Sequence, residues 1–128
     1  MRTRVPLSTR PVIAALATSI LSGCQTMGPA TDVHAPTSAE IAALQTGITL
    51  SFIDPGSTQV AAYTNVGVIA VDGAPVKVIC LLANAKNRMG GYTGMKVTKF
   101  FMSLDDRFLF AEDFMTKVCD SLGLAYPA

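Results

Sequence analysis

The stretch VKVICLLANAKNRMGGYTGMKVTKFFM, residues 76–102, decides the fold of this chain of 128 residues. Two runs rich in apolar and β-branched residues flank a short polar segment that contains the pair Gly90-Gly91. This pattern is typical of a β-hairpin whose polar segment forms the connecting loop. The first run, residues 76–83, is apolar at nearly every position, so we expect it to lie at the centre of a sheet.

The second strand of the hairpin is followed by residues that predict one more, short strand and a C-terminal helix. The returning strand covers residues 95–104, and Asp105-Asp106 forms a tight turn into a short strand, residues 107–111, with Phe108 and Phe110 on one face. Glu112 and Asp113 suit the first turn of a helix that ends near Gly123. The stripe that this helix is expected to bury comprises Phe114, Met115, Val118, Cys119 and Leu122.

The residues before the stretch predict an N-terminal helix and one or two strands. Thr37 and Glu40 fit a capping box, and apolar residues recur at helical spacing over residues 38–52. Gly47 and neighbouring β-branched residues weaken this helix, so a strand that begins near Ile48 is an alternative. Residues 54–57 form a turn, residues 59–71 form one strand or two strands broken at 65–67, and residues 72–75 form another turn.

These elements predict an α+β domain over residues 38–126. A small antiparallel sheet of three to four strands packs against the N-terminal and the C-terminal helix. Half of the residues are hydrophobic, and the chain has room for one domain with a core and not for two.

Two cysteines of this domain, Cys80 and Cys119, are expected to form a disulfide. Cys80 lies in the central apolar strand and Cys119 on the buried stripe of the C-terminal helix, so both positions face the same interface. In an exported protein an even pair is most simply explained by one disulfide. A pair of buried free thiols and a redox or metal site are the alternatives, although no CxxC motif supports the latter.

The N-terminus predicts export. Arg2, Arg4 and Arg10 form a positive region, and the apolar run of residues 12–21 has the length of a signal-peptide core, too short to span a bilayer. The motif Leu21-Ser22-Gly23-Cys24 that follows resembles the lipobox of bacterial lipoproteins. An ordinary secretory signal with a chance cysteine is the alternative.

The lipobox resemblance implies removal of residues 1–23 and a lipid anchor on Cys24. The new N-terminus would carry a diacylglyceryl thioether and an acyl chain such as palmitate, and would hold the protein at a membrane. Gln25 stands where the inner-membrane retention signal has Asp, which implies the outer membrane, with the domain facing the periplasm or the cell surface. Residues 24–37 are interpreted as a flexible tether in which His34 is solvated.

The loop of the hairpin is the candidate binding site. After residue 23 the chain has seven basic and nine acidic residues, and four of the seven basic residues lie between positions 86 and 99. They form a local positive patch, Lys86, Arg88, Lys96 and Lys99, that suits an anionic or glycan-bearing envelope partner. Alternatively, asparagines and glycines only satisfy the backbone of an awkward loop. The candidate residues are Asn84, Lys86, Asn87, Arg88, Gly90, Gly91, Tyr92 and Gly94.

The same residues carry a second resemblance, which covers about residues 52–101. Asp54-Pro55-Gly56-Ser57, Cys80 and the loop are similar to a DPxS…C…NAKNxxGGYxG pattern of small bacterial envelope proteins. The chain departs from that pattern at Leu81, where the family has Gly, and at Met89, where it has an aromatic residue. The resemblance implies the domain boundaries and an envelope location, and no particular activity.

The sequence predicts a non-catalytic role. The adjacent carboxylates at 105–106 and 112–113 are explained by a turn and by a helix N-terminus, and no nucleophile and base can be paired. We expect no metal, no cofactor and no nucleic acid, because His and Cys ligands are too few and the domain is mildly acidic. The alternatives are an inhibitor of a lysozyme-like hydrolase and, less favoured by the residues, an envelope hydrolase.

Overall fold

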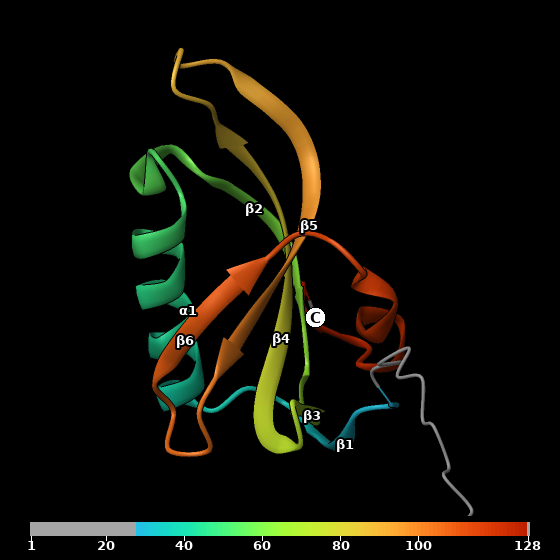
Figure 1. Ribbon diagram of the computed structural model, residues 1–128. Coiled ribbons are helices and arrows are strands. Elements are labelled where there is room, and N and C mark those ends of the chain that lie inside the picture. The colour runs from blue at the N-terminus through green and yellow to red at the C-terminus, as the bar shows by residue number, and fades with distance from the viewer. Residues whose placement is uncertain (1–27, 128) are drawn as a thin grey trace, which may run out of the picture.

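The computed structural model describes residues 28–127, which form a curled antiparallel sheet of seven strands, a half-barrel, with a helix on each side (Figure 1). The α-helix α1 covers one face, and the short 3₁₀ helix η2 covers part of the other. The elements are β1 (Thr31–His34), α1 (Ser38–Ser51), η1 (Pro55–Ser57), β2 (Gln59–Thr64), β3 (Val66–Val71), β4 (Ala74–Lys86), β5 (Tyr92–Met102), β6 (Phe108–Glu112), η2 (Thr116–Ser121) and β7 (Leu124–Tyr126).

The predicted helix and its capping box are confirmed. The Thr37 hydroxyl accepts a hydrogen bond from the Glu40 N–H at 3.2 Å, and a Glu40 carboxylate oxygen accepts one from the Thr37 N–H at 2.9 Å. The alternative strand from Ile48 is wrong, because the helix continues to Ser51. Gly47 is required by packing: a Cβ there would lie 2.6 Å from the ring of Phe100, so only glycine lets α1 approach β5 this closely.

Residues 59–71 were expected to form either one strand or two strands broken at 65–67, and the structure has two. β2 and β3 pair with successive parts of the same edge of β4 and are separated by Asn65 alone. The backbone N–H of Asn65 donates to the Gly123 carbonyl, and its side-chain amide donates to the Leu122 carbonyl, both at 3.0 Å. The interruption therefore exists because Asn65 bonds the C-terminal segment.

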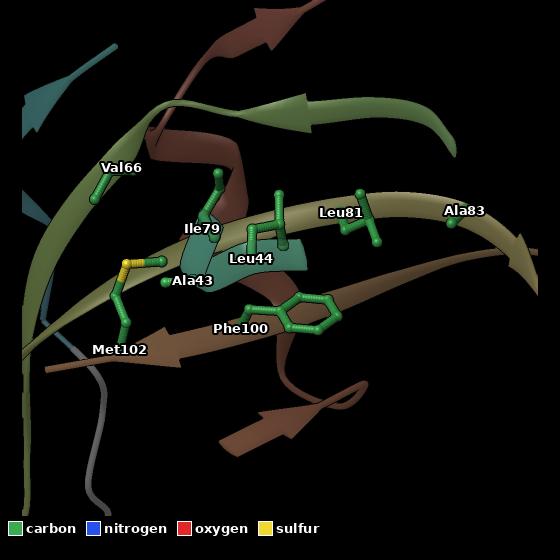
Figure 2. Close-up of a cluster of buried hydrophobic side chains, with 8 residues drawn as sticks. All are labelled: Ala43, Leu44, Val66, Ile79, Leu81, Ala83, Phe100 and Met102. Atoms are coloured by element: carbon green, nitrogen blue, oxygen red, sulfur yellow. The ribbon is translucent and has the colours of Figure 1, made fainter. Parts of the chain in front are cut away.

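The hairpin predicted from the opening stretch is confirmed and forms the centre of the sheet. β4 pairs with β5 from Lys77↔Met102 to Lys86↔Tyr92 on one edge, and with β2 and β3 on the other. Alternate residues of β4 serve two cores. One core lies under α1 and contains Ala43, Leu44, Val66, Ile79, Leu81, Ala83, Phe100 and Met102 (Figure 2). The other lies under η2 and contains Ile69, Val76, Val78, Cys80, Phe101, Val118 and Leu122.

The sheet has more strands than the three to four predicted, so the domain is predominantly β. β1 and β7, which add to the outer edges of β3 and β2, were not predicted. Residues 31–34 were assigned to the flexible tether; in the structure they are a short edge strand. The assignment to a tether was based on composition, which does not show that a four-residue edge strand is ordered by pairing with a distant segment.

The predicted C-terminal helix is also wrong in type and length. Met115 adopts a left-handed conformation with φ +54°, so helical geometry begins only at Thr116 and takes the 3₁₀ form. Phe114 and Met115 are 60% and 58% exposed, outside the buried stripe predicted for them. Val118 and Leu122 are buried as predicted.

β6 carries a bulge that the sequence did not reveal. The register shifts between Phe101↔Phe110 and Met102↔Phe108. Phe108 therefore packs near Phe100 in the core under α1, whereas Phe110 stacks on Phe101 with ring centroids 4.4 Å apart, on the other face. The expectation that Phe108 and Phe110 share a face is wrong, because one extra residue in a strand reverses the alternation.

The Cys80–Cys119 disulfide is present. It joins the central strand to η2 across the core under η2, with the two Cα atoms 5.8 Å apart. It closes a loop of about 40 residues, which contributes roughly 4 kcal/mol on the chain-entropy account. The disulfide holds the short helix that covers this face.

Candidate functional site

The β4–β5 hairpin projects beyond the end of α1 and beyond the other strands (Figure 1). We call residues 84–94 the hairpin tip. Met89 is 95% exposed at its outermost turn, and Arg88 beside it is also exposed. The eight candidate residues predicted from the sequence all lie in this tip, but the structure separates those that shape it from those that face outward.

Asn87 shapes the turn. Its side-chain oxygen accepts hydrogen bonds from the N–H groups of Met89 and Gly91, at 2.9 and 3.1 Å. Its backbone N–H donates to the Gly91 carbonyl at 2.8 Å, and Gly90 donates to the Asn87 carbonyl. Gly90 has φ +80°, which only glycine adopts without strain. These contacts order the turn from within, so they match the structural alternative for Asn87, Gly90 and Gly91.

Asn84 fixes the bend below the turn. Its side-chain oxygen accepts from the Gly94 N–H at 3.0 Å, where Gly94 has φ +95°. The Thr93 hydroxyl donates to the Ala85 carbonyl across the hairpin. The ladder register shifts between Asn84 and Lys86 at the same place. The tip is therefore preorganised by its own polar groups.

Tyr92 and Lys86 fasten the tip to the body. The Tyr92 hydroxyl donates to the Ser57 carbonyl at 2.9 Å. The Lys86 ammonium lies 5.3 Å from the centre of the Tyr92 ring and 4.0 Å from the Asp54 carboxylate. Asp54 and Ser57 of the DPxS motif therefore contact the hairpin tip in space. Lys86 and Tyr92, which were candidates for binding a partner, are already partly occupied by contacts within the protein.

The outward-facing cations are Arg88 and Lys96. Both are exposed, and neither forms an ion pair with any residue in the range 28–127. The segment from Asn84 to Thr98 contains no acidic residue. The positive patch therefore survives on the outer surface of the hairpin, although with fewer members than predicted.

Lys99 does not belong to that patch. It is fully buried, its ammonium lies 2.8 Å from the Glu112 carboxylate, and it lies 5.5 and 5.6 Å from the ring centres of Phe101 and Phe114. A signal was present in the sequence, because strand alternation places Lys99 on the same face as Val97 and Phe101. A lysine on that face needs a carboxylate partner from a neighbouring strand.

A second charged cluster was not predicted, and the expectation that His34 is solvated is wrong, because its ring contacts the Glu40 carboxylate. Glu40 is fully buried, and its carboxylate lies 2.9 Å from His34 Nε2 and 3.0 Å from the Lys77 ammonium. Lys77 in turn lies 2.6 Å from Asp106 in the β5–β6 turn. The cluster joins β1, the start of α1, β4 and that turn. The only signal was Lys77 itself, a charge within an apolar run.

The protonation of this cluster follows from its geometry. His34 Nδ1 faces the Asp32 carbonyl at 2.7 Å while Nε2 faces the Glu40 carboxylate, so both ring nitrogens meet acceptors, an arrangement that favours the protonated ring. The pKa of His34 is raised by these two contacts. Burial raises the pKa of Glu40, but hydrogen bonds from Thr37, Lys77 and His34 outweigh it and lower that pKa to about 2. The cluster is a set of satisfied ion pairs, which fits a structural role.

A hollow also lies beside the disulfide, between η2 and the sheet. Its volume is about 190 Å³, and its lining is mainly apolar. Pockets for drug-sized ligands measure about 300–1,000 Å³, so this hollow is small for such a ligand. Over residues 28–127 there is no cluster of three His, Cys, Asp or Glu side chains suited to a metal, and no helix in that range is long and apolar enough to cross a bilayer.

Comparison of the chain with protein-family models, curated proteins and solved structures finds no match. The lipobox residues 21–24 and Gln25 lie outside the residues that the structure describes.

Proposed function

We propose that the protein is a cell-envelope lipoprotein with a non-catalytic role, which binds another envelope component through the β4–β5 hairpin tip. One observation carries the proposal. The hairpin projects from the body, and its segment from Asn84 to Thr98 holds only basic charges, while residues 28–127 contain seven basic and nine acidic residues. A positive projection on a net acidic domain favours encounter with an anionic partner.

The internal bonds of the tip support this proposal. Because Asn84 and Asn87 hold the turn, little conformational entropy is lost when the tip binds. Arg88 and Met89 are presented outward by that frame. Arginine and methionine are both enriched at protein interfaces, so these two residues are the expected contact points.

The test replaces the outward residues and spares the frame. The variant Arg88→Ala/Met89→Ser should fold as the parent does, because neither side chain has a hydrogen bond to lose within residues 28–127. Its capture of solubilised envelope proteins and envelope glycans should fall about tenfold or more, as for interface hot spots. Lys117→Ala is the matched control, an exposed lysine on η2 without an ion pair in the described part of the chain. Equal capture by both variants would reject the tip as the site.

The proposed lipid anchor and outer-membrane location are tested separately. Mass spectrometry should find diacylglyceryl and palmitoyl groups on Cys24, and membrane fractionation should place the protein in the outer membrane. Cys24→Ser should abolish the lipid modification and remove the protein from the outer-membrane fraction. An unmodified Cys24, or retention of the cysteine variant in the outer-membrane fraction, would contradict the lipoprotein proposal.

A second candidate function is inhibition of a lysozyme-like hydrolase. The observation in its favour is the shape of the hairpin, because a narrow and internally ordered tip can enter an active-site cleft. Residual lysozyme activity measured against increasing amounts of the protein tests it. If the parent protein lowers lysozyme activity and the Arg88→Ala/Met89→Ser variant does not, inhibition through the tip is supported.

A further inference from the structure

The outer edge of β5 is only half covered. β6 pairs with β5 at Lys99, Phe100, Phe101 and Met102 and stops there, whereas β4 pairs with β5 up to Tyr92. Residues 92–98 therefore have one paired edge, and no strand within residues 28–127 covers the other. We call this stretch the free edge. Its backbone N–H and C=O groups form a template for one additional strand.

We propose that the free edge receives an extended, acidic segment of the partner protein as an added strand. The inference rests on the proposed binding function and names the chemistry of the partner. Lys96 lies within the free edge and Arg88 lies in the turn before it; both are exposed, and neither forms an ion pair with residues 28–127. The hairpin has no carboxylate from Asn84 to Thr98, so an incoming acidic strand would meet no like charge within this segment and would be attracted by Arg88 and Lys96.

The same charges disfavour a second copy of this chain as the occupant. Antiparallel pairing of two free edges about their centre, residue 95, would bring Lys96 of one copy near Lys96 of the other. Like charges on neighbouring strands are destabilising. Exposed lysine on an edge strand is also a feature that prevents self-association. The partner is therefore expected to be a different protein.

The side chains of the free edge indicate how apolar and acidic side chains would alternate in the added strand. Val97 packs against the core under η2, and Met95, two residues away, is 53% exposed on the same face. Lys96 lies on the opposite face. A strand with apolar residues on the η2 side and acidic residues on the α1 side would match both faces. Gly94 leaves the backbone open to approach at the end near the tip.

The experiment mixes the full protein with each of three synthetic peptides, and each peptide has the length of the free edge. The first peptide alternates Glu and Val, the second has Lys in place of Glu, and the third is the acidic peptide with alternate amides N-methylated. The N-methylated peptide keeps the charge and side chains but cannot complete a β ladder. Amide hydrogen exchange measured by NMR reports on each strand edge separately.

The acidic peptide should slow exchange of amides in residues 92–98 by about tenfold or more at saturation. Neither the lysine peptide nor the N-methylated peptide should do so. Equal binding of the N-methylated peptide would overturn strand addition, because charge alone would then explain the affinity. Protection at β1, β6 or β7 in place of residues 92–98 would overturn the site.

Competition separates this inference from the proposed function. The acidic peptide should displace the captured envelope partner if that partner adds a strand. Capture that depends on Arg88 and Met89 but resists the peptide would overturn strand addition alone. A glycan as the captured partner would have the same consequence. Capture that neither the tip substitutions nor the peptide affects would overturn both.

Discussion

Replacement of Glu40 by glutamine tests the energetic role of the buried charged cluster. Glu40→Gln keeps the volume and one acceptor for the Thr37 N–H, but it removes the charge that faces His34 and Lys77. The folded-state pKa of Glu40 is about 2, against 4.5 for an unperturbed glutamate. At 1.36 kcal/mol for each pKa unit, the ionised carboxylate stabilises the fold by about 3 kcal/mol at neutral pH.

The stabilisation by Glu40 has a defined pH window. Because its pKa is lowered on folding, the contribution is fully present above about pH 5 and declines as pH falls through 4.5 towards 2. About 2 kcal/mol of it is lost by pH 3. The free energies of unfolding of the parent and Glu40→Gln should therefore differ by about 3 kcal/mol at pH 7 and by about 1 kcal/mol at pH 3.

Urea denaturation from pH 3 to pH 7 measures this difference. Asp113→Asn is the matched control, since Asp113 is exposed and forms no ion pair with residues 28–127. The control should follow the parent at every pH. A Glu40→Gln variant within 0.5 kcal/mol of the parent at pH 7, a difference typical of surface sites, or a loss that does not shrink on acidification, would refute the electrostatic explanation.

Three further predictions concern other contacts. Cys80→Ala/Cys119→Ala should lower the free energy of unfolding by about 3–4 kcal/mol in chemical denaturation, and the parent should lose a similar amount on reduction. Gly47→Ala should destabilise by about 1–3 kcal/mol in the same assay despite its better helix propensity, because the added Cβ overlaps aromatic rings of β5 and β6; a more stable variant would contradict the packing argument. The His34 ring, followed by NMR, should titrate above 6.5 and stabilise β1 below that pH, with the contribution lost as pH rises through its raised pKa. Unchanged titration in Glu40→Gln would show that the carboxylate is not a cause.

Local chemistry made part of the fold predictable. Thr37 and Glu40 lie three residues apart, so the capping box that starts α1 could be inferred from sequence spacing alone. The central hairpin could be inferred because both of its strands and its loop are consecutive. The disulfide could be inferred because Cys80 lies in the buried central strand and Cys119 on the side of the C-terminal segment that packs against it.

Features that depend on distant partners could not be predicted in this way. β1 is ordered by β3, and its four residues carry no strand pattern of their own. The bulge in β6 depends on how it meets β5, so the separation of Phe108 from Phe110 has no local signature. In the tip, the residue types predicted the turn, but only the structure shows that Tyr92 reaches Ser57 and that Arg88 remains outward.

The dual role of β4 constrains how the length of this chain can vary. A residue inserted or deleted between Ala74 and Ile79 would send every later side chain of the strand to the opposite face. Both cores would then lose their central residues at once. The turn at residues 87–91 lies beyond the last ladder pair and escapes this constraint. Chains that diverge from this one should therefore keep the length of the strand and differ in the length of the turn, so that binding preference can change while the sheet does not.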